Sequence, residues 1–165
     1  MKKSILLLSC IVGVQAFAAT DIVPGTPYYM RNASNGKFFT AGGWWGTHAI
    51  VGETGLPVTF ESAGDDQYRA LTPCGYPQAQ DIYIDKPLAE SCVWTAVPVN
   101  GNKYVFKYML DGNEMAVGMD GDMYINQCSL DADNAGQQWE LLTREELVEE
   151  IKLSLIHISE PTRLG

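Results

Sequence analysis

The chain repeats three short sequence patterns in the same order three times, and this recurrence limits the folds that it can adopt. A tyrosine-led run opens each copy, an extended run lies in its middle, and an aromatic residue heads its last run. The opening runs are residues 28–31, 68–71 and 104–107, the middle runs are residues 47–51, 81–85 and 122–126, and the closing aromatics are Phe60, Trp94 and Trp139. A unit of roughly 40 residues cannot bury its own apolar face, so the three copies must share one core.

Turn-forming residues separate these runs. The opening runs are followed by Asn35 and Gly36, by Gly75 and Pro77, and by residues 111–113. Gly, Pro, Asn and Asp interrupt strands and favour turns. No amphipathic helical pattern occurs before Leu142. The sequence therefore predicts an all-β domain of many short strands, and three units of this length fit a closed three-fold barrel better than an open array.

Residues 1–18 have the pattern of a secretory signal peptide. After a short basic start, residues 4–14 are largely apolar, and Ala16 and Ala18 occupy the positions that a signal peptidase reads. The apolar run is too short to span a membrane. We expect cleavage after Ala18 and export to the periplasm, the cell surface or the extracellular space. The alternative is a lipoprotein anchored through Cys10.

The C-terminal part of the chain changes character. Thr143 and Glu146 have the spacing of a capping box, so residues 143–152 predict the start of a helix that leads, as a linker, into a further domain. Residues 153–163 resemble a translated sequencing adapter. We therefore expect residues 153–165 to be an artefact, and the natural chain to continue beyond residue 152 into sequence not shown here.

Charge and cysteine content restrict the partners. The formal net charge is −9, which argues against nucleic acid and anionic membrane surfaces, because both require a basic footprint. Cys74, Cys92 and Cys128 follow the predicted signal peptide. Export permits a disulfide, and the odd number leaves one thiol unpaired or paired elsewhere. We favour a Cys74–Cys92 pair.

Gln137, Gln138 and Trp139 resemble the Q-x-W signature of ricin-type β-trefoil lectin domains, which that family places at the last strand of a repeat. The resemblance covers about residues 27–142. It implies that residues 19–142 form a β-trefoil domain, with three pseudo-repeats of about four strands each around a capped six-stranded barrel. It also implies carbohydrate binding.

The chain further resembles exported multidomain proteins of the Bacteroidetes, in which a T-R-E-[ED]-L helix start, matched by residues 143–147, joins such a module to further domains. The chain departs from the lectin pattern in two ways, and both argue against a sugar site at the positions that the lectins use. The Q-x-W signature occurs once. In the lectins, an Asp near the second strand of a repeat hydrogen-bonds the sugar, and the corresponding residues 39–41 and 115–117 contain no Asp. The resemblance therefore supports the fold more strongly than the sugar site.

Residues 42–46, GGWWG, are the best candidate for a binding surface. Trp44 and Trp45 lie among three glycines in a turn-rich stretch. Indole faces stack on sugar rings, and glycine lets a ligand approach the backbone. We expect at least one of the two tryptophans to be exposed; the alternative is that one caps the barrel and the other covers a loop. His48 is the histidine nearest this surface and a candidate ligand contact, with a surface or strand position as its alternative.

The closing aromatic residues Phe60, Trp94 and Trp139 are expected in the shared core, because large rings at equivalent repeat positions supply most of its apolar area. Gln137 is expected to be structural and to bridge backbone groups between repeats. These four residues therefore support the fold and leave ligand binding to other positions.

The sequence contains no recognisable catalytic or metal-binding motif. Three acidic loops, residues 111–114, 120–122 and 131–134, lack the spacing of an EF-hand, and Asp, Gly and Asn are ordinary turn residues. Calcium binding is kept as an alternative that a chelator would test. No carboxylate pair stands out for glycoside hydrolysis. We predict no cofactor and no metal.

Three functions remain open at this stage. The first is a non-catalytic exported module that binds carbohydrate or another surface polymer. The second is a structural or protein-interaction module without a ligand pocket. The third is an accessory domain of a secreted enzyme, such as a glycoside hydrolase, whose catalytic part lies beyond residue 152. Fold alone does not decide among them.

Overall fold

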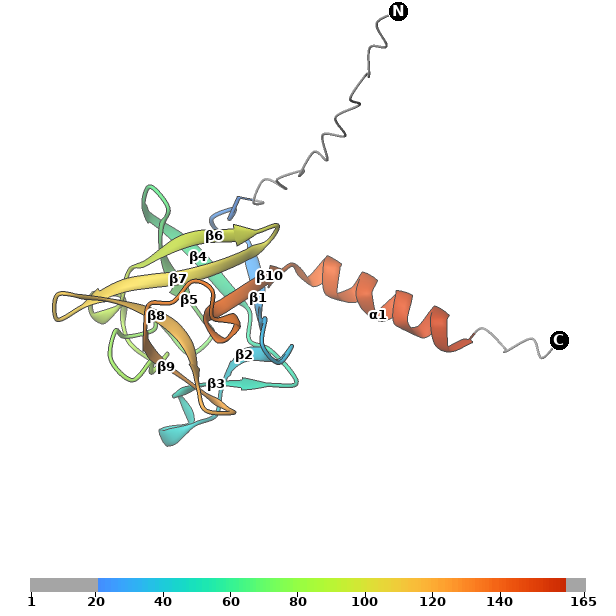
Figure 1. Cartoon of the computed structure of the whole chain (residues 1–165), viewed down its shortest axis with the longest axis horizontal. Coiled ribbons are helices and arrows are strands. Elements are labelled where there is room, and N and C mark those ends of the chain that lie inside the picture. The colour runs from blue at the N-terminus through green and yellow to red at the C-terminus, as the bar shows by residue number, and fades with distance from the viewer. Residues whose placement is uncertain (1–20, 160–165) are drawn as a thin grey trace, which may run out of the picture.

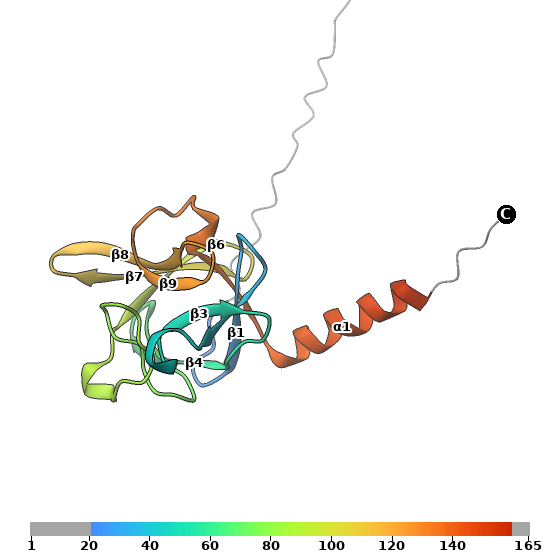
Figure 2. The same ribbon diagram turned by 90° about the horizontal axis from the view of Figure 1, so that it is seen from below.

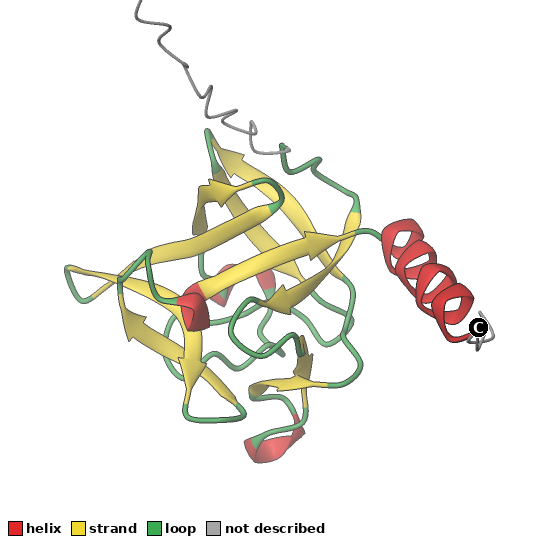
Figure 3. Ribbon diagram, turned by 45° about the vertical axis from the view of Figure 1, so that its right-hand side comes forward, coloured by secondary structure: helices red, strands yellow, loops and turns green. Residues whose placement is uncertain are grey.

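A computed structural model describes residues 21–159 and confirms the all-β prediction (Figure 1). The strands are β1 (Pro27–Asn32), β2 (Phe38–Ala41), β3 (Ala49–Gly52), β4 (Val58–Gly64), β5 (Gln67–Leu71), β6 (Trp94–Asn100), β7 (Lys103–Leu110), β8 (Asn113–Asp120), β9 (Tyr124–Ser129) and β10 (Gln138–Leu142). Three short 3₁₀ turns, η1 (Trp44–Gly46), η2 (Leu88–Glu90) and η3 (Ala135–Gln137), interrupt them, and helix α1 (Arg144–Ser159) follows (Figure 3). The predicted signal peptide, with Cys10, lies outside the described residues.

Six strands close into a barrel. The ring runs β10, β1, β4, β5, β6, β7 and back to β10, and every neighbouring pair is antiparallel. Each repeat contributes its first and last strand, namely β1 and β4, β5 and β6, and β7 and β10. Closure leaves no unpaired edge around the barrel. The fold is a β-trefoil.

Two hairpins and one irregular loop complete the repeats. The hairpins are β2–β3 in the first repeat and β8–β9 in the third. In the second repeat, isolated bridges between Thr72 and Gly75 and between Tyr76 and Lys86 take the place of a hairpin. The three segments meet, because β3 pairs with β9 and an isolated bridge joins residues 48 and 83. Side chains from all three repeats are thereby brought together.

The extended run expected at residues 81–85 is not a strand. Asp81 and Ile82 have φ angles of 54° and 23°, and a left-handed backbone of this kind cannot continue the regular pleat. Ile82 and Ile84 are nonetheless fully buried. The second repeat thus keeps its core positions and loses its hairpin. The prediction of about four strands per repeat is correct for the first and third repeats and wrong for the second.

The closing aromatic residues lie in the shared core. Phe60, Trp94 and Trp139 are fully buried. Phe106, from the middle of β7, has its ring centroid 5.1 Å from that of Phe60 and 5.5 Å from that of Trp94. The Trp139 Nε1 group donates a hydrogen bond to the carbonyl of Val117 at 2.8 Å. This hydrogen bond satisfies the one polar group of a ring buried for its apolar area.

Gln137 is a buried bridge within the third repeat. Its Nε2 donates to the carbonyl oxygen of Ser129 at 2.8 Å, and its Oε1 accepts from the amide of Asp131 at 2.9 Å. Both partners belong to the third repeat, so the expected bridge between repeats is wrong. Gly118 makes room for this side chain, because a Cβ there would lie 2.8 Å from Gln137 Cγ.

The three described cysteines, Cys74, Cys92 and Cys128, are free thiols, so the predicted Cys74–Cys92 disulfide is wrong. Cys74 is exposed in the loop after β5, whereas the Cys92 thiol faces the carbonyl oxygen of Val93 at 3.7 Å. Burial raises the pKa of Cys92 to about 12. A thiol that stays protonated is a poor nucleophile, so Cys92 is expected to react slowly.

Helix α1 begins at the predicted capping box. The Thr143 amide donates to Glu146 Oε2 at 2.7 Å, and the Glu146 amide donates to Thr143 Oγ1 at 3.3 Å. The helix projects from the trefoil in both views of Figures 1 and 2. It continues into residues 153–159, whose adapter origin stays a prediction. No helix in residues 21–159 has the length and apolarity needed to cross a membrane.

One ion pair ties helix α1 to the barrel. Arg31 of β1 donates from Nη1 to Glu150 of the helix at 2.8 Å and from Nε to Glu140 of β10 at 2.9 Å. The bond to Arg31 holds the pKa of Glu150 below its usual value. The contact is partly exposed, so it orients the helix at a modest gain in stability.

Candidate functional site

The loop between β2 and β3 presents two tryptophans on a glycine frame. Gly42 and Gly46 have φ angles of 150° and 79°, a region that glycine enters without cost. At Gly43, a Cβ would lie 3.0 Å from His48 Cβ and 3.2 Å from Tyr124 Cε1. The absence of a side chain at Gly43 therefore lets the loop pack closely against the residues beneath it.

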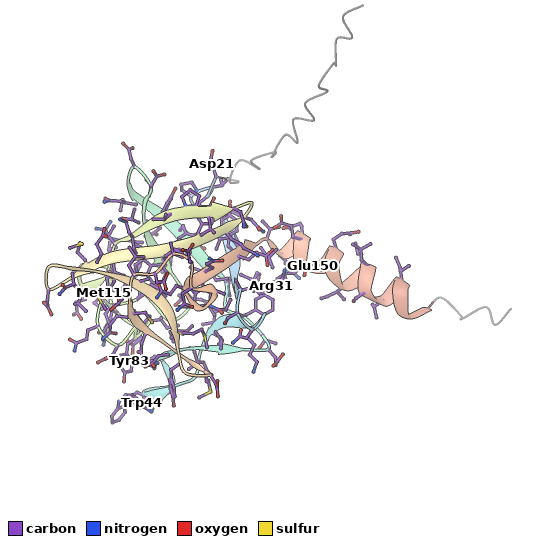
Figure 4. All side chains as sticks on the ribbon, in the orientation of Figure 1. Asp21, Arg31, Trp44, Tyr83, Met115 and Glu150 are labelled. Carbon is purple, nitrogen blue, oxygen red and sulfur yellow. The ribbon has the colours of Figure 1, made fainter. Side chains whose placement is uncertain are left out.

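Trp44 and Trp45 both face solvent. Their exposed fractions are 63% and 90%, and Figure 4 shows Trp44 at the margin of the molecule. Trp45 also has a φ of 61°, a conformation that costs energy for a bulky residue and that persists where surrounding structure enforces it. The fold thus holds two large apolar rings where the hydrophobic effect alone would not leave them.

A cluster of aromatic rings supports Trp44 from below. The Trp44 ring lies 5.8 Å from His48 and 5.5 Å from Tyr124, and His48 lies 5.0 Å from Tyr83 and 5.5 Å from Tyr124, all between ring centroids. His48, Tyr83 and Tyr124 come from the first, second and third repeat. All three repeats therefore fix the position of Trp44. We call Trp44, Trp45, His48, Tyr83 and Tyr124 the aromatic cap.

His48 is a buried support and is not a surface residue. It is 1% exposed. Its Nδ1 lies 2.9 Å from the carbonyl oxygen of Ala49 and its Nε2 lies 3.0 Å from Asn126 Oδ1. At this burial His48 offers no surface to a ligand, so the structure does not support it as a ligand contact. Of the alternative positions, surface or strand, the strand comes closer, because His48 forms a bridge with Tyr83. His48 positions Trp44.

Two carboxylates are hydrogen-bonded to residues next to the aromatic cap. Asp85 Oδ2 accepts a hydrogen bond from Thr47 Oγ1 at 2.8 Å, and Asp120 Oδ2 accepts one from Asn126 Nδ2 at 2.9 Å. Both aspartates are exposed. The bond from Thr47, together with the nearby ammonium of Lys86, holds the pKa of Asp85 below its usual value. Asp85 is therefore ionised at neutral pH, and the cap has a negatively charged border.

Two hollows lie away from the aromatic cap. One of about 400 Å³ separates helix α1 from β1 and β2, and another of about 470 Å³ lies among β5, β6, β7 and the loop before β6. Neither is lined by Trp44 or Trp45. Unlike these two hollows, the aromatic cap is built from residues of all three repeats. It offers stacking area to an extended ligand without enclosing it.

The acidic loops form turns. The Asp133 amide donates to Asp131 Oδ1 at 3.1 Å, and Asp111 adopts a φ of 50°, a left-handed turn conformation that Asp tolerates. Within residues 21–159, no three His, Cys, Asp or Glu side chains gather in a way that could hold a metal ion. Within the described part of the chain, these loops therefore do not form a set of ligands for calcium.

Comparison with known proteins shows the fold alone. No protein-family model and no curated protein matches the chain. A solved structure of a Polyporus squamosus lectin, bound to a Neu5Ac-containing human-type influenza-binding epitope, is similar with a TM-score of 0.56 and 14% identity over 73% of this chain. The structure of Cry35Ab1 is similar with a TM-score of 0.55 and 16% identity over 76% of this chain. The chain spans 50% of the lectin and 37% of Cry35Ab1.

The site contains residues that the sequence pattern did not single out as functional. Tyr83 and Tyr124 occupy matching places in the recurrent runs at residues 81–85 and 122–126, so the repeat itself carried the signal. Asp85 lies in the same recurrent run and Asp120 in an acidic loop, but their position next to the cap follows from hydrogen bonds to Thr47 and Asn126 that only the three-dimensional arrangement creates.

Proposed function

We propose that this chain is a carbohydrate-binding module whose ligand stacks on Trp44 and Trp45. The observation that carries the proposal is the exposure of both rings, 63% and 90%, on a loop whose backbone is strained at Trp45 and supported by all three repeats. Aromatic faces bind the apolar faces of sugar rings, and a rigid aromatic surface loses little conformational entropy on binding. The likeness to a glycan-bound lectin agrees with this role.

The binding mode differs from that expected of the lectin resemblance. Three of the six strand positions that would carry the sugar-binding Asp hold buried apolar residues, namely Phe39, Ala116 and Val117. These side chains fill the core and cannot reach a ligand. We therefore assign recognition to the β2–β3 loop, where Trp44 and Trp45 supply area and the neighbouring carboxylates supply hydrogen-bond acceptors.

A glycan array followed by calorimetric titration tests the proposal. Trp44→Ala and Trp45→Ala should each weaken binding by roughly tenfold, because each removes about 1.5 kcal/mol of ring contact. Met109→Ala is the matched control, because Met109 is also a large apolar residue, 59% exposed on the β7–β8 hairpin. Binding that survives in both tryptophan variants, or the absence of any glycan ligand, contradicts the proposal and favours a structural or protein-interaction module.

Export and continuation into a further domain belong to the same proposal. Residues 1–18 support export through their signal-peptide pattern, and helix α1 supports a connection because its capped start directs the chain away from the trefoil. Completing the gene beyond residue 152 tests the connection. A catalytic domain there would make this chain the accessory module of an enzyme. A stop codon close to residue 152 would remove that role.

A further inference from the structure

The loops around the aromatic cap carry an excess of acidic side chains. Residues 42–48, 81–86 and 120–124 contain four aspartates and one lysine, Lys86. Two of the aspartates are attached to the residues beneath Trp44. Asp85 accepts from Thr47, whose neighbour in sequence is His48, and Asp120 accepts from Asn126, whose Oδ1 contacts His48. Each carboxylate is therefore held by a hydrogen bond to a residue that adjoins or contacts His48, the histidine beneath Trp44.

The one lysine of these loops does not offset the acidic border. Its Nζ lies 3.5 Å from Asp85 Oδ1 and 5.8 Å from the centroid of the Tyr83 ring. Lys86 is thus already oriented by one carboxylate and one aromatic face. The contacts of Lys86 are with Asp85 and Tyr83, so its charge does not pair with Asp120 or the neighbouring Asp122. A ligand that approaches Trp44 meets a negative field.

Aromatic faces bordered by carboxylates favour a particular chemistry. The face of an indole attracts a cation through the ring quadrupole, and an ionised carboxylate attracts the same cation by charge. An anionic ligand is repelled by the same groups. From this geometry we infer that the aromatic cap selects glycans that carry protonated amino groups over neutral and anionic glycans. The inference rests on the proposed function and adds the class of sugar.

The test compares a cationic, a neutral and an anionic oligosaccharide, of which the first two share length and linkage and differ in whether the amino group is free or acetylated. The whole chain is titrated with a β-1,4-linked glucosamine hexamer, with the matching N-acetylglucosamine hexamer, and with a sialylated trisaccharide. The titrations are made at about pH 5.5, where amines are protonated and carboxylates ionised, in low salt and again in about 0.5 M NaCl. The glucosamine hexamer should bind about tenfold tighter than its N-acetylated counterpart in low salt, and high salt should remove the difference.

Charge-neutralising variants locate the effect. Asp85→Asn and Asp120→Asn should each weaken binding of the glucosamine hexamer by about fivefold, the value of one carboxylate–ammonium contact in water, and leave the N-acetylated hexamer unchanged. Asp65→Asn, an equally conservative change at an exposed aspartate in the β4–β5 turn, should alter neither. Thermal unfolding of each variant verifies that it is folded, and the salt dependence of the unmodified chain needs no variant at all.

The outcomes separate this inference from the proposed function. Equal or tighter binding of the N-acetylated hexamer or the sialylated trisaccharide overturns the preference for amino sugars and leaves a carbohydrate-binding module. Failure of all three probes to bind, in a glycan array that also shows no ligand, overturns both. A preference for the glucosamine hexamer that persists in Asp85→Asn and Asp120→Asn also overturns the inference, because the charge would then lie elsewhere.

Discussion

Replacing Trp45 with glycine should preserve or raise the stability of the fold while it removes the ligand-binding ring. Trp45 holds a φ of 61° and is 90% exposed. The left-handed conformation costs an L-residue about 1–2 kcal/mol. Glycine removes that cost. The greater freedom of glycine in the unfolded chain opposes this gain and destabilises the fold by about 0.5–1 kcal/mol. Since almost no ring area is buried, we expect Trp45→Gly to stabilise the chain by roughly 0–1.5 kcal/mol.

Urea unfolding monitored by far-ultraviolet circular dichroism measures this difference directly, because the midpoint shifts at constant slope when stability alone changes. Trp44→Gly is the matched control. The Trp44 ring contacts His48 and Tyr124 with centroids at 5.8 and 5.5 Å, so its removal should cost about 1 kcal/mol or more. A loss above about 1 kcal/mol in Trp45→Gly would refute the reasoning, because the ring would then pack against the protein in solution.

Three further predictions concern other parts of the chain. Gly118→Ala should lower the free energy of unfolding by roughly 2 kcal/mol, because its Cβ would lie 2.8 Å from a buried side chain; calorimetry measures it. Ellman's reagent should modify exposed Cys74 quickly near pH 8 and Cys92 slowly, since burial raises the pKa of Cys92 to about 12, and Cys74→Ser should lose the fast phase. The Arg31–Glu150 ion pair holds the pKa of Glu150 down, so its contribution is present at neutral pH and lost as pH falls through that lowered value; the protection of the helix α1 amides, corrected for the intrinsic pH dependence of hydrogen exchange, should fall in acid and in Arg31→Ala at neutral pH.

Much of the fold could be predicted from the sequence, because a three-fold repeat encodes its own symmetry. Large aromatic residues at matching repeat positions, Phe60, Trp94 and Trp139, predict a shared core from the sequence alone. All three are fully buried in the structure. The second repeat could not be read in the same way. Asp81 and Ile82 resemble the start of a strand by residue type, yet their left-handed backbone ends the pleat.

The candidate site could be predicted only in part from the sequence. Two tryptophans between glycines indicate an exposed surface, and both rings are exposed. The burial of His48 depends on Tyr83 and Tyr124, which lie far away in sequence and meet it through contacts between repeats. A single sequence does not show which residues from different repeats come into contact. The same limit applies to the cysteines, whose pairing depends on distances that residue types do not encode.

Indole resonances offer the most direct test of the proposed binding surface. The chain has four tryptophans, of which Trp44 and Trp45 are exposed and Trp94 and Trp139 are fully buried. In a ¹⁵N-labelled chain, each gives a separate Nε1–H signal, assigned by single substitution. Titration with the tightest glycan of the array should shift the signals of Trp44 and Trp45 and leave those of Trp94 and Trp139 in place. A glycan that binds with equal affinity and leaves the first two signals unmoved would contradict the proposed site.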